Sequence, residues 1–198
     1  MKVIATILAC IATFFVLSAV IPTAEEAEIY DSFVRLHVIA NSNSDEDQSL
    51  KLKVRDKVLD KINEYDVTSK EEAFYVLKEC KGELEKIAET EIRANGKSYD
   101  VSIEIGEESY PTRYYDDFCL PAGNYNSVRV VIGDGDGENW WCVLYPPLCR
   151  EGALSYEDAY IDVGLTKDQY DLITQSSGKY KVKFKLLELA ASVAGIDY

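Results

Sequence analysis

Basic residues are scarce in this chain of 198 residues, which has 21 Lys and Arg against 35 Asp and Glu and a formal net charge of −14 at pH 7. Nucleic acids and anionic lipid headgroups are bound by basic surfaces, because their phosphate charge has to be neutralised. The composition therefore argues against both as partners. Its length and its ordinary apolar content favour a single domain with a sizeable core and an acidic, solvated surface.

Histidine is rarer still, since His37 is the only one. The chain also lacks an H-E-x-x-H motif, a zinc-binding cysteine cluster and a Walker loop. Paired with a cysteine or serine, His37 could act as a general base. A single histidine without a nucleophile signature is usually a packed, hydrogen-bonded residue, and no pair of carboxylates stands out. We therefore predict no catalytic residue, no cofactor and no metal ligand.

The glycine-rich segment 133–138, Gly-Asp-Gly-Asp-Gly-Glu, has two tempting interpretations. Its G-x-G-x-G spacing precedes an apparent strand, whereas a dinucleotide site needs a helix N-terminus there. Asp134 and Asp136 could begin a calcium loop, but the glycine and the distal glutamate of an EF-hand are not in register. The segment is predicted to be a hairpin that connects two strands.

The N-terminal segment is the longest stretch without charge. Lys2 is followed by nineteen uncharged, mostly apolar residues, 3–21, and then by Pro22 and an acidic run at 25–28. A short positive start before an apolar stretch is typical of an export signal, and the stretch is just long enough to span a bilayer. We predict that residues 1–24 are a signal peptide or membrane anchor and that residues 25–198 form one exported domain. The N-terminal segment would engage the membrane at least during export.

Export makes the cysteines informative. Apart from Cys10 in the apolar stretch, the chain has Cys80, Cys119, Cys142 and Cys149, which allow three full pairings. Cys142 and Cys149 are close enough in sequence for a local disulfide if the intervening prolines turn the chain back. Cys80 and Cys119 are predicted to be buried thiols.

Periodicity predicts an α+β fold, a single domain with a mixed or antiparallel sheet covered by helices and preceded by the export signal or anchor helix. Apolar residues alternate with polar ones in several segments, whereas a repeat of three to four residues marks two long helices that start at Ser44 and Thr68, the second ending at Asn95-Gly96. The lysines of the first helix are expected to be solvated. The predicted strands are 33–40, 98–105, 110–118, 125–132, 139–145 and a lysine-lined edge strand at 179–185, and further short helices are predicted at 156–163, 166–176 and 186–194.

Segment 139–149 contains both tryptophans, Trp140 and Trp141, and is predicted to be the central strand, ended by Pro146-Pro147. Neighbouring side chains of a strand point to opposite faces. One tryptophan is therefore expected to anchor the core, and the other to lie under a helix or at a binding surface.

Two groups of motifs resemble the stage II sporulation protein R family of endospore-forming bacteria. The first runs from Arg35–Ser42 into Asp47–Asp56. The second comprises Leu120–Tyr125, Val128–Gly133, Asn139–Val143 and Pro146–Cys149. The order of the motifs and the export signal also fit, and the resemblance covers most of residues 30–198.

The resemblance implies an exported signalling protein rather than an enzyme. Such proteins pass from the forespore into the space between the two membranes that separate it from the mother cell. There they activate a membrane-embedded aspartic protease of the mother cell, which processes the precursor of sigma-E. The implied location is this intermembrane space, with membrane anchoring left open, and no cofactor is implied.

Contact residues for this partner are a hypothesis taken from the two motif groups. The candidate surface combines the strand end at 35–41 with the Asn-Trp-Trp segment, and its members are Arg35, His37, Asn41, Asn139, Trp140 and Trp141. Two alternatives stay open at this point. The chain could be an exported hydrolase that uses His37 with Cys142 or Cys149, or a cell-wall-binding module in which a tryptophan stacks on sugar.

Overall fold

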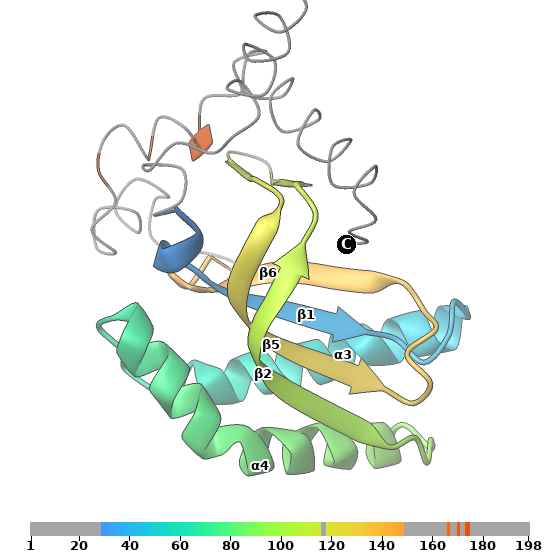
Figure 1. Cartoon of the computed structure of the whole chain (residues 1–198). Coiled ribbons are helices and arrows are strands. Elements are labelled where there is room, and N and C mark those ends of the chain that lie inside the picture. Colours follow the sequence, from blue (N-terminus) through green and yellow to red (C-terminus); the bar gives the residue numbers. More distant parts are fainter. Residues whose placement is uncertain (1–28, 116–117, 149–165, 167–169, 171–172, 175–198) are drawn as a thin grey trace, which may run out of the picture. The chain divides into compact units, whose positions relative to one another are not determined.

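The computed structural model describes residues 29–115, 118–148, 166, 170 and 173–174 (Figure 1). Two long helices follow the first strand, and the remaining strands follow the helices. In chain order the elements are β1 (Val34–Ile39), α3 (Asp45–Ile62), α4 (Lys70–Ala94), β2 (Val101–Tyr110), β3 (Arg113–Tyr114), β4 (Cys119–Leu120), β5 (Gly123–Ile132) and β6 (Asn139–Tyr145).

The main sheet has four strands in the order β2-β5-β1-β6. Strand β1 pairs in parallel with β5 and antiparallel with β6, so the sheet is mixed. Helices α3 and α4 lie along one face of it (Figure 1). The fold class predicted from the sequence, a single α+β domain with a mixed sheet covered by helices, is confirmed. The predicted limits of that domain, residues 25 and 198, lie outside the described residues.

The centre of the sheet is not where the sequence placed it. Among the described strands β6 is at the edge, and β1 lies between β5 and β6. All six residues of β1 are buried, as expected for a strand with neighbours on both sides and cover on both faces. The alternation of polar and apolar residues in β1 did not predict its central position, because the polar residues are buried too. The prediction that the tryptophan segment is the central strand was therefore wrong.

The described residues form two compact units. The larger one comprises residues 31–108 and 124–148. Its core lies between the helices and the sheet and includes Leu36, Val54, Leu84, Val128 and Val130. The smaller unit includes residues 109–115 and 118–123, with the short antiparallel pair β3–β4. There the Tyr30 hydroxyl donates a hydrogen bond to the carbonyl of Ala122 at 3.1 Å.

Helix α3 begins as predicted. Ser44 is its N-cap and accepts a hydrogen bond from the Asp47 amide at 3.2 Å, and three acidic residues occupy the first turn. The lysines of this helix are not all solvated, however. Lys51 is only 4 % exposed, and its Nζ donates to the carbonyl of Glu138 at 2.9 Å. Its long aliphatic stem packs inward while its charge meets a backbone acceptor.

Helix α4 begins one residue later than predicted. Ser69, not Thr68, is the N-cap and accepts from the Glu72 amide at 3.1 Å. The Glu72 carboxylate accepts from the amide of Thr68, the residue before the N-cap, at 2.9 Å, so the capping arrangement lies one residue after the predicted one. The predicted end is confirmed, with Asn95 as C-cap and Gly96 in the left-handed region at φ 74°.

Segment 133–138 is a crossover, not the predicted hairpin. The strands that it joins, β5 and β6, lie on opposite sides of β1, so the segment passes over the end of β1. Its backbone bonds to that end, where the Gly137 amide donates to Ala40 O at 2.9 Å and the Asp136 amide to Asn41 O at 3.2 Å. A Cβ at Gly137 would collide with the carbonyl oxygen of Ser42, which explains the glycine.

Several other predictions concern segments that differ in extent or are not described. Strand β2 runs five residues beyond the predicted 98–105. Within the predicted strand 110–118, Arg113–Tyr114 forms the two-residue strand β3, and its partner β4 lies just after that range, at Cys119–Leu120. The apolar stretch 3–21 and the predicted elements at 156–163, 179–185 and 186–194 lie outside the described residues, as does most of 166–176. Neither long helix of the described part is apolar enough to cross a membrane.

Candidate functional site

A polar cluster occupies the face of the sheet that α3 and α4 do not cover. Leu36, Val128 and Val130 face the helices, so strand alternation directs the residues between them to the opposite face. There the strands bring together six side chains, which we call the His37 cluster: His37 from β1, Glu108 from β2, Ser127 and Arg129 from β5, and Asn139 and Trp141 from β6.

His37 is held from three sides. Its Nδ1 lies 2.7 Å from Oε1 of Glu108, and its Nε2 lies 2.8 Å from Oδ1 of Asn139. The ring of Trp141 stacks on it with centroids 3.6 Å apart and an interplanar angle of 18°. The register of β1 and β6 explains the stack, since it places His37 directly opposite Trp141. The histidine is 5 % exposed, so it lies beneath the surface.

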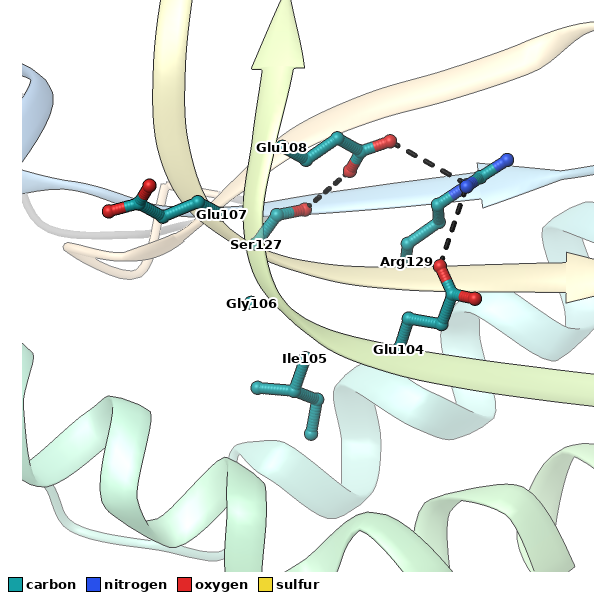
Figure 2. A pocket seen from close by; sticks show the side chains of 7 residues that line it. All are labelled: Glu104, Ile105, Gly106, Glu107, Glu108, Ser127 and Arg129. Carbon is teal, nitrogen blue, oxygen red and sulfur yellow. Dashed lines mark hydrogen bonds and ion pairs between the residues drawn. The ribbon is translucent and has the colours of Figure 1, made fainter.

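Glu108 is the anion of the cluster. Burial raises the pKa of its carboxyl group, but the hydrogen bond and charge of His37, the hydrogen bond from Ser127 and the charge of Arg129 outweigh this and lower that pKa below its ordinary value. The Ser127 hydroxyl donates to Oε2 at 2.8 Å, and Arg129 Nε lies 3.7 Å from Oε1 (Figure 2). Glu108 is therefore ionised at neutral pH.

This arrangement positions a buried histidine rather than a nucleophile. In a nucleophile–base pair the hydroxyl or thiol donates to the histidine, whereas the Ser127 hydroxyl donates to Glu108. Cys142, one of the two cysteines considered as a partner of His37, is disulfide-bonded and so has no thiolate to offer. Cys149, the other one, lies outside the described residues, so the predicted Cys142–Cys149 pairing stays a prediction. Cys80 and Cys119 are not disulfide-bonded; Cys80 is buried as predicted, whereas Cys119, also predicted to be buried, is half-buried.

Arg35 belongs to the interior. It is fully buried, its Nε donates to the carbonyl of Cys142 at 3.1 Å, and its guanidinium lies 5.0 Å from the ring centroid of Tyr125. A hydrogen bond to a backbone carbonyl and contact with an aromatic ring stabilise the charge of a buried arginine. The alternation of residues 33–40 gave no sign that this charge would be enclosed.

The two tryptophans point to opposite faces, as predicted, but neither is in the fully buried core. Trp141 is half-buried against His37, while Trp140 is 38 % exposed on the helix side. The guanidinium of Arg55 in α3 lies 4.2 Å above the Trp140 ring. Leu52, one turn before Arg55, is 36 % exposed. We call Leu52, Arg55 and Trp140 the Trp140 patch.

Asn41 connects the end of β1 to the crossover segment. Its Oδ1 accepts from the Asp134 amide at 3.1 Å, and its Nδ2 donates to Asp47 Oδ2 at 2.9 Å. Hydrogen bonds from Ser42 and Asn41 lower the pKa of the Asp47 carboxyl group. Asn43 bonds to the crossover in the same way, through the Glu138 amide at 2.7 Å. Asn41 therefore has a structural role that its place in a polar turn did not reveal.

The structure divides the six residues of the predicted partner surface. Asn139 and Trp140 are exposed, Asn41 and Trp141 are half-buried, and Arg35 and His37 are buried. Whether a partner contacts them stays a prediction. Sequence reasoning missed Glu108 and Ser127, because they lie 71 and 90 positions from His37 and only strand pairing brings them together. Among the described residues, no group of three or more His, Cys, Asp and Glu side chains is placed to hold a metal ion.

Comparison with known proteins gives one consistent result. The family profile described as Stage II sporulation protein R matches residues 30–154. The curated protein named Stage II sporulation protein R from Bacillus subtilis (strain 168) is 38 % identical over 157 residues, which cover 73 % of this chain and 70 % of that protein. No solved structure matches significantly. The chain therefore belongs to the stage II sporulation protein R family.

Proposed function

We propose that this protein is an exported sporulation signal that activates a membrane-embedded aspartic protease of the mother cell and so leads to processing of the precursor of sigma-E. The observation that carries the proposal is the family match over residues 30–154, which includes both motif groups. The protein would act in the space between forespore and mother cell, by contact rather than by catalysis. The uncharged stretch 3–21 supports export, since it has the length and flanks of a signal or anchor.

The described contacts favour a non-enzymatic role. The histidine is enclosed by Glu108, Asn139 and Trp141, and Cys142 is oxidised. A buried histidine of this kind stabilises the sheet, so loss of function in a His37→Gln variant would not by itself indicate catalysis. The informative variant for the hydrolase alternative is Cys149→Ser, and a fully active variant would exclude that cysteine as the nucleophile.

The Trp140 patch is the part of the chain best suited to contact the protease. The Arg55–Trp140 pair, with Leu52 exposed one turn before Arg55, offers both apolar area and a charge, and tryptophan and arginine are the residue types that dominate interface energies. Trp140 lies next to exposed Asn139 in β6, which is an edge strand among the described strands, and this position suits contact with a partner from the side of the sheet. Arg55 already covers one face of the ring, which holds Trp140 in a fixed orientation.

The first experiment tests export and signalling. Deleting the gene should block processing of the sigma-E precursor in sporulating cells, and the full chain expressed in the forespore should restore it. A version without residues 1–24 should fail to restore it, because it stays in the forespore cytoplasm. Full rescue by that cytoplasmic form would contradict the export mechanism.

The second experiment tests the surface. Trp140→Ala should reduce sigma-E processing by about tenfold or more, since truncating an interface tryptophan often costs 2 kcal/mol or more, which is about thirtyfold in affinity. Tyr75→Ala is the matched control, because Tyr75 is also an exposed aromatic residue, 64 % exposed on α4. Photocrosslinking residues placed at Leu52 and Asn139 should capture the protease, whereas one at Tyr75 should not. Equal activity of both variants, with no crosslink from Leu52 or Asn139, would refute the proposed surface.

The cell-wall alternative is tested by sedimentation with purified peptidoglycan. Trp141 is stacked on His37 and Trp140 is covered on one face by Arg55, so each ring has a face already in use. We expect the chain to stay in the supernatant. Saturable binding that is lost in Trp140→Ala would favour the wall-binding module instead.

A further inference from the structure

The outer edge of β2 has the features of a peptide-binding strand. Among the described strands β2 is outermost, so half of its backbone groups point away from its neighbour β5. The Ile103 amide shows this direction, because it donates to the side chain of Glu85 in α4 at 3.4 Å rather than to a strand. Backbone amides alternate along a strand, so those of Ile105 and Glu107 point the same way.

A hollow of about 220 Å³ adjoins this edge and is lined by residues 104–108 of β2 with Ser127 and Arg129 of β5. Gly106 lies at its base, and Figure 2 shows Glu104 and Glu108 on either side of that glycine, with Ile105 directed towards the helices. A Cβ at Gly106 would meet no heavy atom of the described chain within 4 Å. Packing therefore does not require glycine here, and its effect is to keep the hollow open for an approaching chain.

The charges around the hollow define what it would accept. Glu104 and Glu108 lie on the same face of β2 as Gly106, whereas Glu107 points away from Glu108 (Figure 2), so carboxylates flank this edge on both faces against the single guanidinium of Arg129. Arg129 lies 3.4 Å from Glu104 and 3.7 Å from Glu108, so it is shared between two of them and leaves Glu107 uncompensated within this group. An excess of negative charge attracts a basic segment and repels a second copy of the same edge.

The sequence of the β2 edge favours pairing with another strand. Exposed edges are commonly blunted by lysine or proline, and Val101–Glu108 contains neither. Its acidic residues prevent self-pairing, which leaves a basic strand as the partner that both the backbone and the charges accommodate.

We propose that the edge of β2 at residues 104–108 binds an extended segment of a partner protein by strand addition, with a lysine or arginine side chain of that segment in the hollow over Gly106. Backbone hydrogen bonds to Ile105 and Glu107 supply the pairing. The carboxylates of Glu104 and Glu108 face the basic side chain in the hollow, and Glu107 attracts a neighbouring basic side chain on the opposite face of the added strand. This surface is distinct from the Trp140 patch, since β2 and β6 are the opposite edges of the described sheet, and it does not depend on the signalling proposal.

The test measures binding of a rhodamine-labelled peptide, acetyl-Lys-Thr-Lys-Val-Lys-Thr-Lys-amide, to the full chain in mild detergent by fluorescence anisotropy. Two control peptides separate the contribution of charge from that of backbone pairing. One has glutamate in place of every lysine, and the other keeps the lysines but carries N-methyl groups on alternate residues, so that it cannot pair with a strand. Only the first-named peptide is expected to bind.

Three variants test the geometry. Glu107→Gln should weaken binding about two- to fivefold, because it removes one exposed charge. Glu107→Pro should weaken it about tenfold or more, because it also removes an outward amide. Gly106→Val should do the same by filling the hollow, and the open space there lets the variant fold, which circular dichroism checks. Gly82→Ala in α4, where the described chain also leaves open space, is the matched control and should bind normally.

Equal binding of the N-methylated peptide, or equal binding to Glu107→Gln and Glu107→Pro, would overturn strand addition. Equal binding of the glutamate peptide would overturn the selection of a basic segment. A dimer of the wild-type chain in sedimentation that Glu107→Pro abolishes would show that the edge pairs with a second copy, and it would likewise overturn the proposal.

Discussion

The substitution Glu108→Gln is expected to lower the free energy of unfolding by about 2 kcal/mol at neutral pH. Glutamine has the size of glutamate but carries no charge, and its amide group can accept at one atom only. Glu108 accepts from His37 at 2.7 Å and from Ser127 at 2.8 Å. A hydrogen bond to a charged group contributes about 1.5–3 kcal/mol. Glutamine keeps one acceptor atom, and the Glu108 side chain is 20 % exposed to screening solvent, so the expected loss corresponds to about one such hydrogen bond.

The pH dependence of this effect has a definite sign. In the folded chain burial raises the pKa of Glu108, but the hydrogen bonds with His37 and Ser127 and the nearby charge of Arg129 outweigh burial and lower that pKa. Glu104 is the nearby anion that shares Arg129. A group with a lowered folded pKa stabilises the fold above its ordinary pKa, and this stabilisation is lost as the pH falls through the folded value. The difference between wild type and Glu108→Gln should therefore be largest near neutral pH and shrink in acid.

The assay is urea unfolding of the full chain in mild detergent, followed by tryptophan fluorescence, which reports on the stack of Trp141 with His37. Glu104→Gln is the matched control on the same strand. Its ion pair with Arg129 is 3.4 Å long and largely exposed, so its loss should cost no more than about 0.5 kcal/mol. A Glu108→Gln variant that unfolds at the same urea concentration as Glu104→Gln would refute the assignment of Glu108 as the buried anion of the cluster.

Two further predictions concern the crossover and the cysteines. Gly137→Ala should destabilise the chain by about 2 kcal/mol, because the new Cβ collides with the carbonyl oxygen of Ser42. Gly82→Ala should be neutral or stabilise the chain by up to about 1 kcal/mol. Thermal unfolding of the two variants checks this difference, and equal melting temperatures would contradict it. Burial raises the pKa of the Cys80 thiol, so iodoacetamide should label Cys80 slowly in the native chain and readily in urea. Cys142 should be labelled only after reduction. Mass spectrometry after each step checks both expectations, and native labelling of Cys142 without reductant would be inconsistent with its disulfide.

The sequence determined which local elements form. The polar turn at Ser44 with its acidic first turn specifies the start of α3, and Asn95-Gly96 specifies the end of α4, because caps depend on hydrogen bonds within a few residues. The alternation of apolar residues identified β1 and β2, the aromatic-rich apolar run before Pro146-Pro147 identified β6, and the two motif groups identified the family. Each of these signals is contained in a short window of the chain.

The tertiary structure alone decided the order of the strands and the contents of the site. Whether β6 is central or at an edge depends on which strands pair, and pairing is a long-range choice that alternation does not encode. The same holds for Gly133–Glu138, which becomes a crossover only because β1 inserts between β5 and β6. The burial of Arg35 and His37 follows as well, since Cys142, Glu108 and Asn139 reach them from strands far along the sequence. Within a single strand these polar residues would be expected to face water. In the folded sheet they are buried, because hydrogen bonds to residues of other strands replace their hydrogen bonds to water.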